Sequence, residues 1–240
     1  VPYNDSDALR TAVSEKTCAI MVEPIQGEGG VLPAKQEFLQ TARDLCDQYG
    51  ALLIFDEVQS GMGRSGHLFA YQHYGVTPDV LSSAKSLGGG FPIGAMLTTA
   101  KVAEHFSVGT HGTTYGGNLL ASVVAEAVLD VVNQHDVLEG IKQRQEWFES
   151  RLKQIGERYG IFKEIRGLGL LLGCVMSDSW AGKAGEVMKA AHDEGVMVLV
   201  AGPDVLRLAP SLVITEKEVT QGLDSLEKAI SKLASQSKAA

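Results

Sequence analysis

Two ionisable residues, Asp56 and Lys85, each come directly after a segment that the sequence predicts to be a short buried strand. Asp56 follows residues 51–55, and Lys85 follows residues 79–84 and precedes three consecutive glycines, Gly88–Gly90. Short apolar runs bounded by polar residues and glycine are typical of buried strands. The carboxyl ends of neighbouring parallel strands meet at one edge of a sheet. We therefore expect Asp56 and Lys85 to reach the same edge.

An amine and a carboxylate at such an edge suit a cofactor that needs a covalent anchor and a negative partner. Pyridoxal phosphate (PLP) is such a cofactor, because a lysine forms a Schiff base with it and an aspartate keeps its pyridine nitrogen protonated. A simple ion pair between Lys85 and Asp56 explains the same positions equally well. Position and spacing alone leave both interpretations open.

The elements that must position these residues alternate between strands and helices. The sequence predicts strands over 18–23, 51–55 and 79–84, a helix from Phe38 to Cys46 that stops at Gly50, and a short helix over 68–74. Strands that alternate with helices form βαβ units and a mostly parallel sheet covered by helices. We predict an α/β fold whose ligands bind beyond the carboxyl ends of the strands.

The second half of the chain predicts a smaller α/β domain. An apolar helix over 119–133 is expected to be buried on more than one face, and a break at 134–136 places the boundary between domains 1–134 and 135–240. The predicted elements beyond it are a helix over 137–159, a strand over 168–175, a helix over 181–194, strands over 196–200 and 205–208, and a last helix that opens with the capping box Thr215–Glu218. We expect an irregular tail after Ser235.

Composition excludes several classes of function. The 240 residues carry 21 Lys and Arg against 29 Asp and Glu, a net charge of −8, which argues against nucleic acid or an anionic membrane as the main partner. No apolar run approaches the ~20 residues of a membrane helix. The histidines and cysteines lack the spacing of metal ligands, so no metal is predicted. Three cysteines in apolar stretches favour reduced core thiols and a cytoplasmic location.

Two other motifs compete with this interpretation. Residues Ala51–Glu57 fit the apolar strand and Asp-Glu pair of a nucleotide-hydrolysing domain, but no Gly-x-x-x-x-Gly-Lys-Ser/Thr string accompanies them. The glycines of Gly167–Gly173 imitate a dinucleotide fingerprint with the wrong spacing, and we interpret them as sheet packing. A non-catalytic homologue that keeps the fold is a third alternative, and the presence of both Lys85 and Asp56 disfavours it.

Four motifs together carry a family resemblance. They are Val22–Glu28 (VEPIQGE), Asp56–Gln59 (DEVQ), Ala84–Lys85 with its glycines, and His111–Asn118 (HGTTYGGN). In this order and at these separations they resemble the class III, ornithine-type aminotransferases, almost from end to end. The closest resemblance is to the acetylornithine and succinylornithine branch, and residues 201–207 favour the succinylornithine type.

The resemblance implies a PLP-dependent transferase of fold type I, in which part of a three-layer large domain is joined to a small C-terminal domain. Lys85 would form the Schiff base with PLP and move the proton. Asp56 would pair with the pyridine nitrogen, Val58 would pack on the ring face, and Gln59 would lie near the ring hydroxyl. Thr114 would bind the cofactor phosphate of the partner subunit, so the resemblance also implies a homodimer with shared active sites.

The resemblance further implies how the substrates bind. Thr113 would lie beside the substrate, and Glu28 and Arg207 would form a switchable pair that opens to admit a carboxylate and closes to admit an amino group. A plain salt bridge remains the alternative for that pair. The implied reaction moves an amino group from N-succinylornithine or N-acetylornithine to 2-oxoglutarate in arginine metabolism.

The chain departs from the family pattern in three respects, of which one, Ser60 and Ser65 in place of the more common threonine, should matter little. Leu119 stands where proline usually follows Gly-Gly-Asn. Family members are also considerably longer, so the resemblance implies that these 240 residues are a C-terminal portion. Alone, such a portion is expected to be a poor catalyst, because the phosphate loop and the aromatic residue that stacks on the cofactor would precede it.

Overall fold

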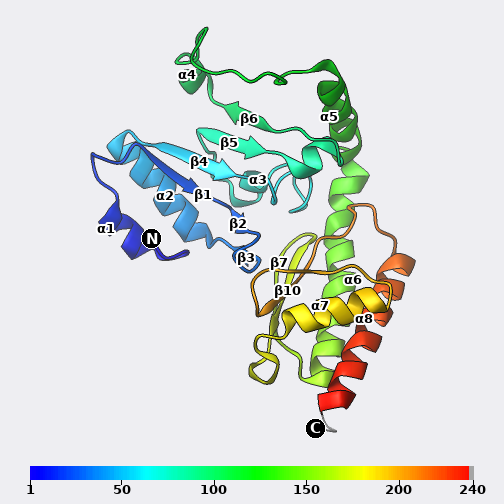
Figure 1. The fold of residues 1–240 in the computed structure, drawn as a ribbon. Helices are drawn as coiled ribbons and strands as arrows, with labels where there is room; N and C mark the ends of the chain where they lie inside the picture. Colours follow the sequence, from blue (N-terminus) through cyan, green and yellow to red (C-terminus); the bar gives the residue numbers. More distant parts are fainter. Residues whose placement is uncertain (238–240) are drawn as a thin grey trace. The chain divides into compact units, whose positions relative to one another are not determined.

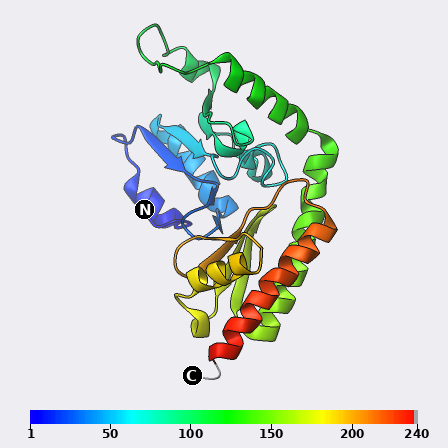
Figure 2. The ribbon, with the colours of Figure 1, turned by 45° about the vertical axis from the view of Figure 1, so that its right-hand side comes forward.

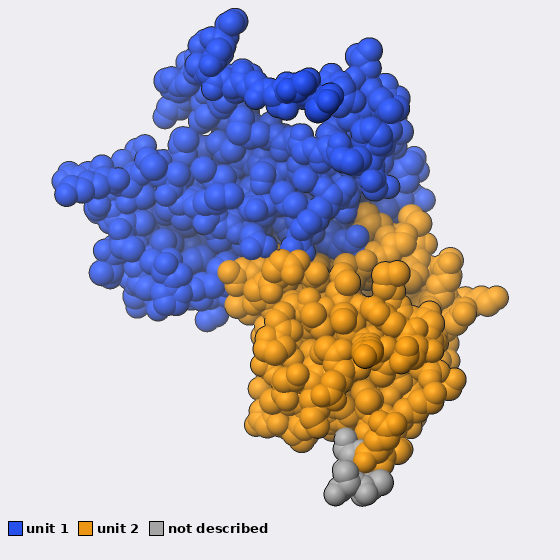
Figure 3. Space-filling view, in the orientation of Figure 1, with its two compact units in different colours: residues 1–24, 34–138 blue, residues 25–33, 139–240 orange. Residues whose placement is uncertain are grey.

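The computed structural model describes residues 1–237, which form two compact units. Unit 1 comprises residues 1–24 and 34–138, and unit 2 comprises residues 25–33 and the chain from Glu139 onward (Figure 3). The sequence places the boundary between 134 and 135. In the structure the main change of unit falls between Leu138 and Glu139, and the short segment 25–33 belongs to the second unit.

Unit 1 is built around a four-stranded sheet (Figure 1). Its elements are α1 (Ser6–Ala12), β1 (Ala19–Val22), α2 (Gln36–Tyr49), β4 (Leu52–Asp56), α3 (Ala70–Tyr74), β5 (Val80–Ser83), the 3₁₀ helix η1 (Lys85–Gly88), β6 (Ala95–Thr98), α4 (Ala100–Ala103) and α5 (Leu119–Val132). The strand order is β1-β4-β5-β6, with β1, β4 and β5 parallel. The predicted mostly parallel α/β sheet is therefore confirmed, while the antiparallel edge strand β6 was not predicted.

The positions of β4 and β5 are fixed by Asp79, the residue before β5. Its carboxylate accepts hydrogen bonds from the backbone N–H of Leu53 in β4 and from Arg43 in α2, both at 2.8 Å. Its own backbone N–H donates to the carbonyl of Leu53 at 2.8 Å. Helix α2 ends at Gly50, whose φ of 68° is accessible to glycine at little cost, and its apolar face packs with Phe55 in the core. These contacts hold α2 against the sheet and fix β4 beside β5.

Helix α5 differs from its prediction. Only Ala121 and Ala125 are buried, whereas Leu119, Leu120 and Val123 are exposed. The expectation that this helix is buried on more than one face is therefore wrong for the described chain. The small alanine side chains allow close packing on one side, and no described segment covers the other.

Unit 2 holds a second four-stranded sheet and a small hairpin (Figure 2). Its elements are β2 (Ile25–Gln26), β3 (Leu32–Pro33), α6 (His135–Tyr159, of which the first four residues belong to unit 1), β7 (Phe162–Leu168), β8 (Leu171–Met176), η2 (Asp178–Trp180), α7 (Ala184–Asp193), β9 (Leu199–Val200), β10 (Val205–Leu208) and α8 (Glu216–Ser237). The sheet order is β7-β8-β10-β9, and all its pairs are antiparallel.

The single strand predicted over 168–175 is wrong. The chain instead forms an antiparallel hairpin of β7 and β8, and it turns at Gly169, whose φ is 60°. The apolar run Leu168–Leu172 conceals the turn, because both strand ends at this point are themselves apolar. Gly167 lies near the end of β7 and Gly173 lies within β8, whereas Gly169 lies in the turn between the two strands.

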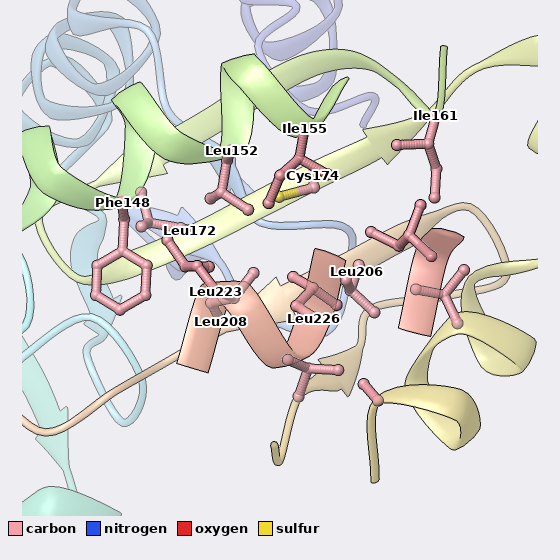
Figure 4. Close-up of a cluster of buried hydrophobic side chains, with 14 of the residues drawn as sticks. Phe148, Leu152, Ile155, Ile161, Leu172, Cys174, Leu206, Leu208, Leu223 and Leu226 are labelled. Atoms are coloured by element: carbon pink, nitrogen blue, oxygen red, sulfur yellow. The ribbon is translucent and has the colours of Figure 1, made fainter. Parts of the chain in front are cut away.

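The core of unit 2 lies between the sheet and its helices. Figure 4 shows Phe148, Leu152 and Ile155 of α6 and Leu223 and Leu226 of α8 around the apolar side chains of β8. Every residue of β8 is buried, because the hairpin β2–β3 covers its second face through Val31 and Ile25. Burial on both faces explains the near-continuous apolar sequence of this strand.

Several local predictions can now be compared with the structure. The capping box is confirmed, since the backbone N–H of Glu218 donates to the Thr215 hydroxyl and the Glu218 carboxylate accepts from the backbone N–H of Thr215. Cys46 and Cys174 are buried thiols, whereas Cys18 is exposed, contrary to the expectation of a core position.

The predicted irregular tail is helical to Ser237, and residues 238–240 lie outside the described residues. No helix in the described part of the chain is both long and apolar enough to span a membrane.

Glu57 is a buried carboxylate that closes the N-terminus of α3. It is 1% exposed and accepts hydrogen bonds from the backbone N–H groups of Ala70 at 2.5 Å and Tyr71 at 2.8 Å, and from the Ser60 hydroxyl at 3.3 Å. Burial raises the pKa of Glu57 above its ordinary value of 4.5, while the three donors act in the opposite direction. Glu57 therefore links the segment after β4 to the helix that follows it.

Replacing Glu57 tests this link. Glu57→Gln should lower the free energy of unfolding at neutral pH by about 1–3 kcal/mol, because the amide NH₂ faces backbone donors. The raised pKa means that folded Glu57 binds its proton more tightly than unfolded Glu57, so its contribution to stability falls as pH rises through that pKa. The variant should lose this slope in urea denaturation between about pH 4 and about pH 8. The exposed Glu15→Gln is the control, and equal effects of both variants would contradict the assignment.

Candidate active site

The carboxyl ends of β4 and β5 bring the two sequence-predicted ionisable residues to one edge. Asp56 is the last residue of β4 and lies opposite Ser82 of β5 in the parallel register. Lys85 begins η1, two residues after β5 ends at Ser83. The two residues therefore lie at the carboxyl ends of neighbouring parallel strands, at one edge of the sheet, as their positions in the sequence predict.

The Asp56 carboxylate is oriented by two donors. The Ser82 hydroxyl donates to Oδ1 at 3.1 Å, and the backbone N–H of Val58 donates to the same oxygen at 3.0 Å. Oδ2 accepts from neither group. Asp56 is half-buried, as are Val58 and Gln59 directly after it. The arrangement fixes one carboxylate oxygen and leaves the other without these two donors.

Lys85 adopts a left-handed backbone conformation, with φ 47°, which a lysine rarely adopts. Glycines hold the turn that follows it. A Cβ at Gly88 would lie 2.8 Å from Ile93, and a Cβ at Gly89 would lie 2.9 Å from Val128 of α5. Only residues without a side chain allow these close approaches, so the glycines permit the packing that keeps Lys85 at the sheet edge.

The Lys85 side chain is exposed, and it forms no ion pair with Asp56 in the described structure. The simple ion pair that the sequence left open is therefore not present. An unusual backbone conformation at a residue whose amine is available is typical of functional sites.

The position of Glu57 argues against the alternative that residues 51–57 belong to a nucleotide-hydrolysing domain. Such a site requires the carboxylates after the strand to act on a metal-bound nucleotide, whereas the Glu57 carboxylate is turned into the core and capped by α3. Among the described residues, no group of three or more His, Cys, Asp or Glu side chains is arranged to hold a metal ion.

The loop that contains Thr113 and Thr114 is exposed throughout residues 103–120. Phe106 and His111 form an edge-to-face ring contact within it, with centroids 5.2 Å apart. Asn118 caps α5 by accepting from the backbone N–H of Ala121 at 2.9 Å. The structure thus presents both threonines at the surface of unit 1, next to the exposed apolar side of α5.

Glu28 and Arg207 meet in unit 2. Arg207, in β10, donates from Nη1 to Oε1 of Glu28 at 2.7 Å, across 179 residues of sequence. The Arg207 side chain is 10% exposed and that of Glu28 is 71% exposed. A buried arginine is thus paired with a carboxylate that solvent can reach, which allows the carboxylate to move without disturbing the core.

Two further residues, Ser82 and Arg166, were not predicted to contribute. Ser82 orients Asp56, and the available signal was a hydroxyl residue at the carboxyl end of the predicted strand. Arg166 binds the backbone of the loop that carries Glu28. No short motif signals that contact, because it joins residues 136 positions apart.

Comparison with known proteins identifies the family. A family model described as aminotransferase class-III matches residues 3–230. The succinylornithine transaminase/acetylornithine aminotransferase of Pseudomonas aeruginosa is 66% identical over 233 residues, which cover 97% of this chain and 57% of that protein. An acetylornithine aminotransferase of Vibrio vulnificus is 58% identical, with 97% of this chain and 58% of that protein covered.

Solved structures agree with these matches. The N-acetylornithine aminotransferase from Stenotrophomonas maltophilia superposes with a TM-score of 0.92 at 45% identity, covering 98% of this chain and 62% of that one. The ornithine aminotransferase from Toxoplasma gondii gives 0.91 at 34% identity, covering 98% and 56%. The chain thus spans little more than half the length of the relatives it matches. Its architecture is that of the PLP-dependent fold type I, and the chain belongs to the class III aminotransferases.

Proposed function

We propose that the protein is a PLP-dependent aminotransferase that moves an amino group from N-succinylornithine or N-acetylornithine to 2-oxoglutarate. The observation that carries this proposal is the placement of Asp56 and Lys85 after neighbouring parallel strands. The family and the printed activities of the relatives support the reaction class and the type of donor. The products would be the acylated semialdehyde and glutamate.

The residues present fit the cofactor. PLP, when bound, supplies an electron sink for the carbon that carries the amino group. Asp56 has one oxygen fixed by Ser82 and Val58 and the other without those donors, which suits a carboxylate that must face a protonated ring nitrogen. The unpaired amine of Lys85 suits a covalent anchor and a base that moves a proton at the reacting carbon. Val58 and Gln59, directly after Asp56, are proposed to contact the ring face and the ring hydroxyl.

The Glu28–Arg207 pair is proposed to let one site accept two kinds of substrate. When Glu28 leaves, Arg207 can bind a carboxylate of 2-oxoglutarate or glutamate through charge-assisted hydrogen bonds. When Glu28 stays, the pair neutralises the arginine, and an amino group can enter beside it. The 71% exposed Glu28 side chain supports such movement, because little packing opposes it.

A homodimer is part of the same proposal. Thr114 is proposed to bind the cofactor phosphate of the partner subunit, and Thr113 to lie beside the substrate. The exposed loop 103–120 and the exposed Leu119, Leu120 and Val123 of α5 support a partner at this surface, since large apolar patches are typical of protein interfaces. We also propose a cytoplasmic location, in keeping with three free cysteines.

Lys85→Ala should abolish steady-state transamination by the full-length protein, because it removes the covalent anchor and the proton-moving amine. Borohydride reduction of the wild-type protein with PLP, followed by peptide mass spectrometry, should place the adduct on Lys85. The exposed Lys101→Ala is the control and should retain activity. An adduct on another lysine would contradict the assignment.

Asp56→Asn should keep the fold, because an asparagine oxygen can still accept from Ser82 and Val58. It should lose about 2–5 kcal/mol of transition-state stabilisation, since the charge opposite the ring nitrogen is lost. The measurement is kcat/KM of the full-length protein, beside the exposed control Asp44→Asn. Turnover near that of the wild type would overturn the proposed role.

A further inference from the structure

The loop that carries Glu28 lies on one face of the unit 2 sheet. Hairpin β2–β3 places Val31 and Ile25 in a cluster with Leu171, Val175 and Val205 of the sheet. The helices cover the opposite face. Because the Glu28 side chain is 71% exposed, packing of the side chain does not hold its carboxylate in place. The backbone of residues 27–31 therefore helps to determine where that carboxylate lies, together with the hydrogen bond from Arg207.

Three residues form a row across the sheet beneath this loop. Arg166 of β7 pairs with Gly173 of β8, and Gly173 pairs with Arg207 of β10. Directly paired residues place their side chains on the same face of a sheet. Arg166 and Arg207 therefore flank a position that has no side chain.

Val31 occupies that position. A Cβ built on Gly173 would lie 2.7 Å from Cβ of Val31, so only glycine leaves room for it. Val31 is fully buried and has a φ of 51°, a conformation that a β-branched residue adopts only under strain. Its surroundings must hold it there, since the local preference of valine opposes this conformation.

Arg166 supplies much of that restraint. Its Nε donates to the carbonyls of Gly30 and Val31, each at 3.1 Å, and its Nη2 donates to the carbonyl of Gly30 at 2.7 Å. Its Nη1 donates to Glu164 at 3.1 Å. Two arginines on the same sheet face thus bind the loop at two points. Arg166 donates hydrogen bonds to its backbone carbonyls, and Arg207 donates one to the Glu28 carboxylate.

We propose that Arg166, with Gly173, is a positioning determinant that keeps Glu28 on Arg207 and so sets the balance between the amino donor and 2-oxoglutarate. The inference rests on the proposed function of the Glu28–Arg207 pair. Loosening the loop weakens the paired state, which the amino donor requires, and leaves Arg207 available to the carboxylate of 2-oxoglutarate. The half-reaction with the amino donor should therefore become slower, and the half-reaction with 2-oxoglutarate should not.

The test measures the two half-reactions separately with the full-length protein and PLP. Arg166→Met should lower kcat/KM for N-acetylornithine about tenfold, as expected for the loss of charge-assisted hydrogen bonds, and change kcat/KM for 2-oxoglutarate less than about twofold. Arg166→Lys should recover part of the loss. Gly173→Ala, which removes no charge, should shift the ratio in the same direction by displacing Val31.

Arg151→Met is the matched control. Its side chain is 27% exposed against 22% for Arg166, and it bonds to Asp224 and Glu227 of α8. It should leave the ratio of the two half-reactions unchanged. Hydrogen exchange of the backbone amides of residues 27–31 should accelerate in Arg166→Met and stay unchanged in Arg151→Met. This measurement reports local opening of the loop independently of activity.

A double-mutant cycle separates this inference from the proposed function. Glu28→Gln alone should shift the ratio, and adding Arg166→Met should then change it little, because no carboxylate remains to be positioned. If Glu28→Gln leaves the ratio unchanged, the switch itself is refuted. If Glu28→Gln shifts the ratio but Arg166→Met lowers both half-reactions equally, or adds its full effect in the double variant, the positioning role is refuted.

Discussion

The parallel pairing of β4 with β5 is the constraint on which the proposed catalytic edge depends. The register that sets Asp56 opposite Ser82 also brings the Ser82 hydroxyl to the Asp56 carboxylate and places the turn of Lys85 beyond the next strand end. Asp79 secures the other end of the same two strands through Leu53 and Arg43. A slip of one residue would turn Asp56 and its serine to opposite faces, so the chemistry at this edge is inseparable from the register.

In unit 2, charged side chains are positioned differently, by a row of residues across an antiparallel sheet. Its row of two arginines around Gly173 combines one guanidinium that holds backbone carbonyls with another that holds a carboxylate. The absence of a side chain at the centre of the row admits Val31, and burial of Val31 offsets the cost of its left-handed backbone. Both units therefore place the proposed functional side chains by strand pairing, with glycine where the backbone or a neighbour must approach closely.

Features with a local cause could be predicted from the sequence. Helix α2, the strands β4 and β5 and the capping box at Thr215 each follow from periodicity, apolar runs or one capping pair. The hairpin of β7 and β8 was missed because apolar residues continue through its turn. The exposure of α5 could not be predicted, since an apolar helix gives no indication of which surface will cover it. The same holds for Arg166, whose partners lie in a distant segment and are backbone carbonyls, which any residue provides.

The most direct test of this account is a crystal structure of the full-length protein with PLP. The account predicts a covalent bond from Nζ of Lys85 to the cofactor and a hydrogen bond from the ring nitrogen to Oδ2 of Asp56 of about 2.7–2.9 Å, the length of a charge-assisted bond. It also predicts that Oδ1 of Asp56 keeps its bonds to Ser82 and Val58. A cofactor bound to another lysine, or an Asp56 carboxylate turned away from the ring nitrogen, would contradict the central claim that one strand pairing creates the site.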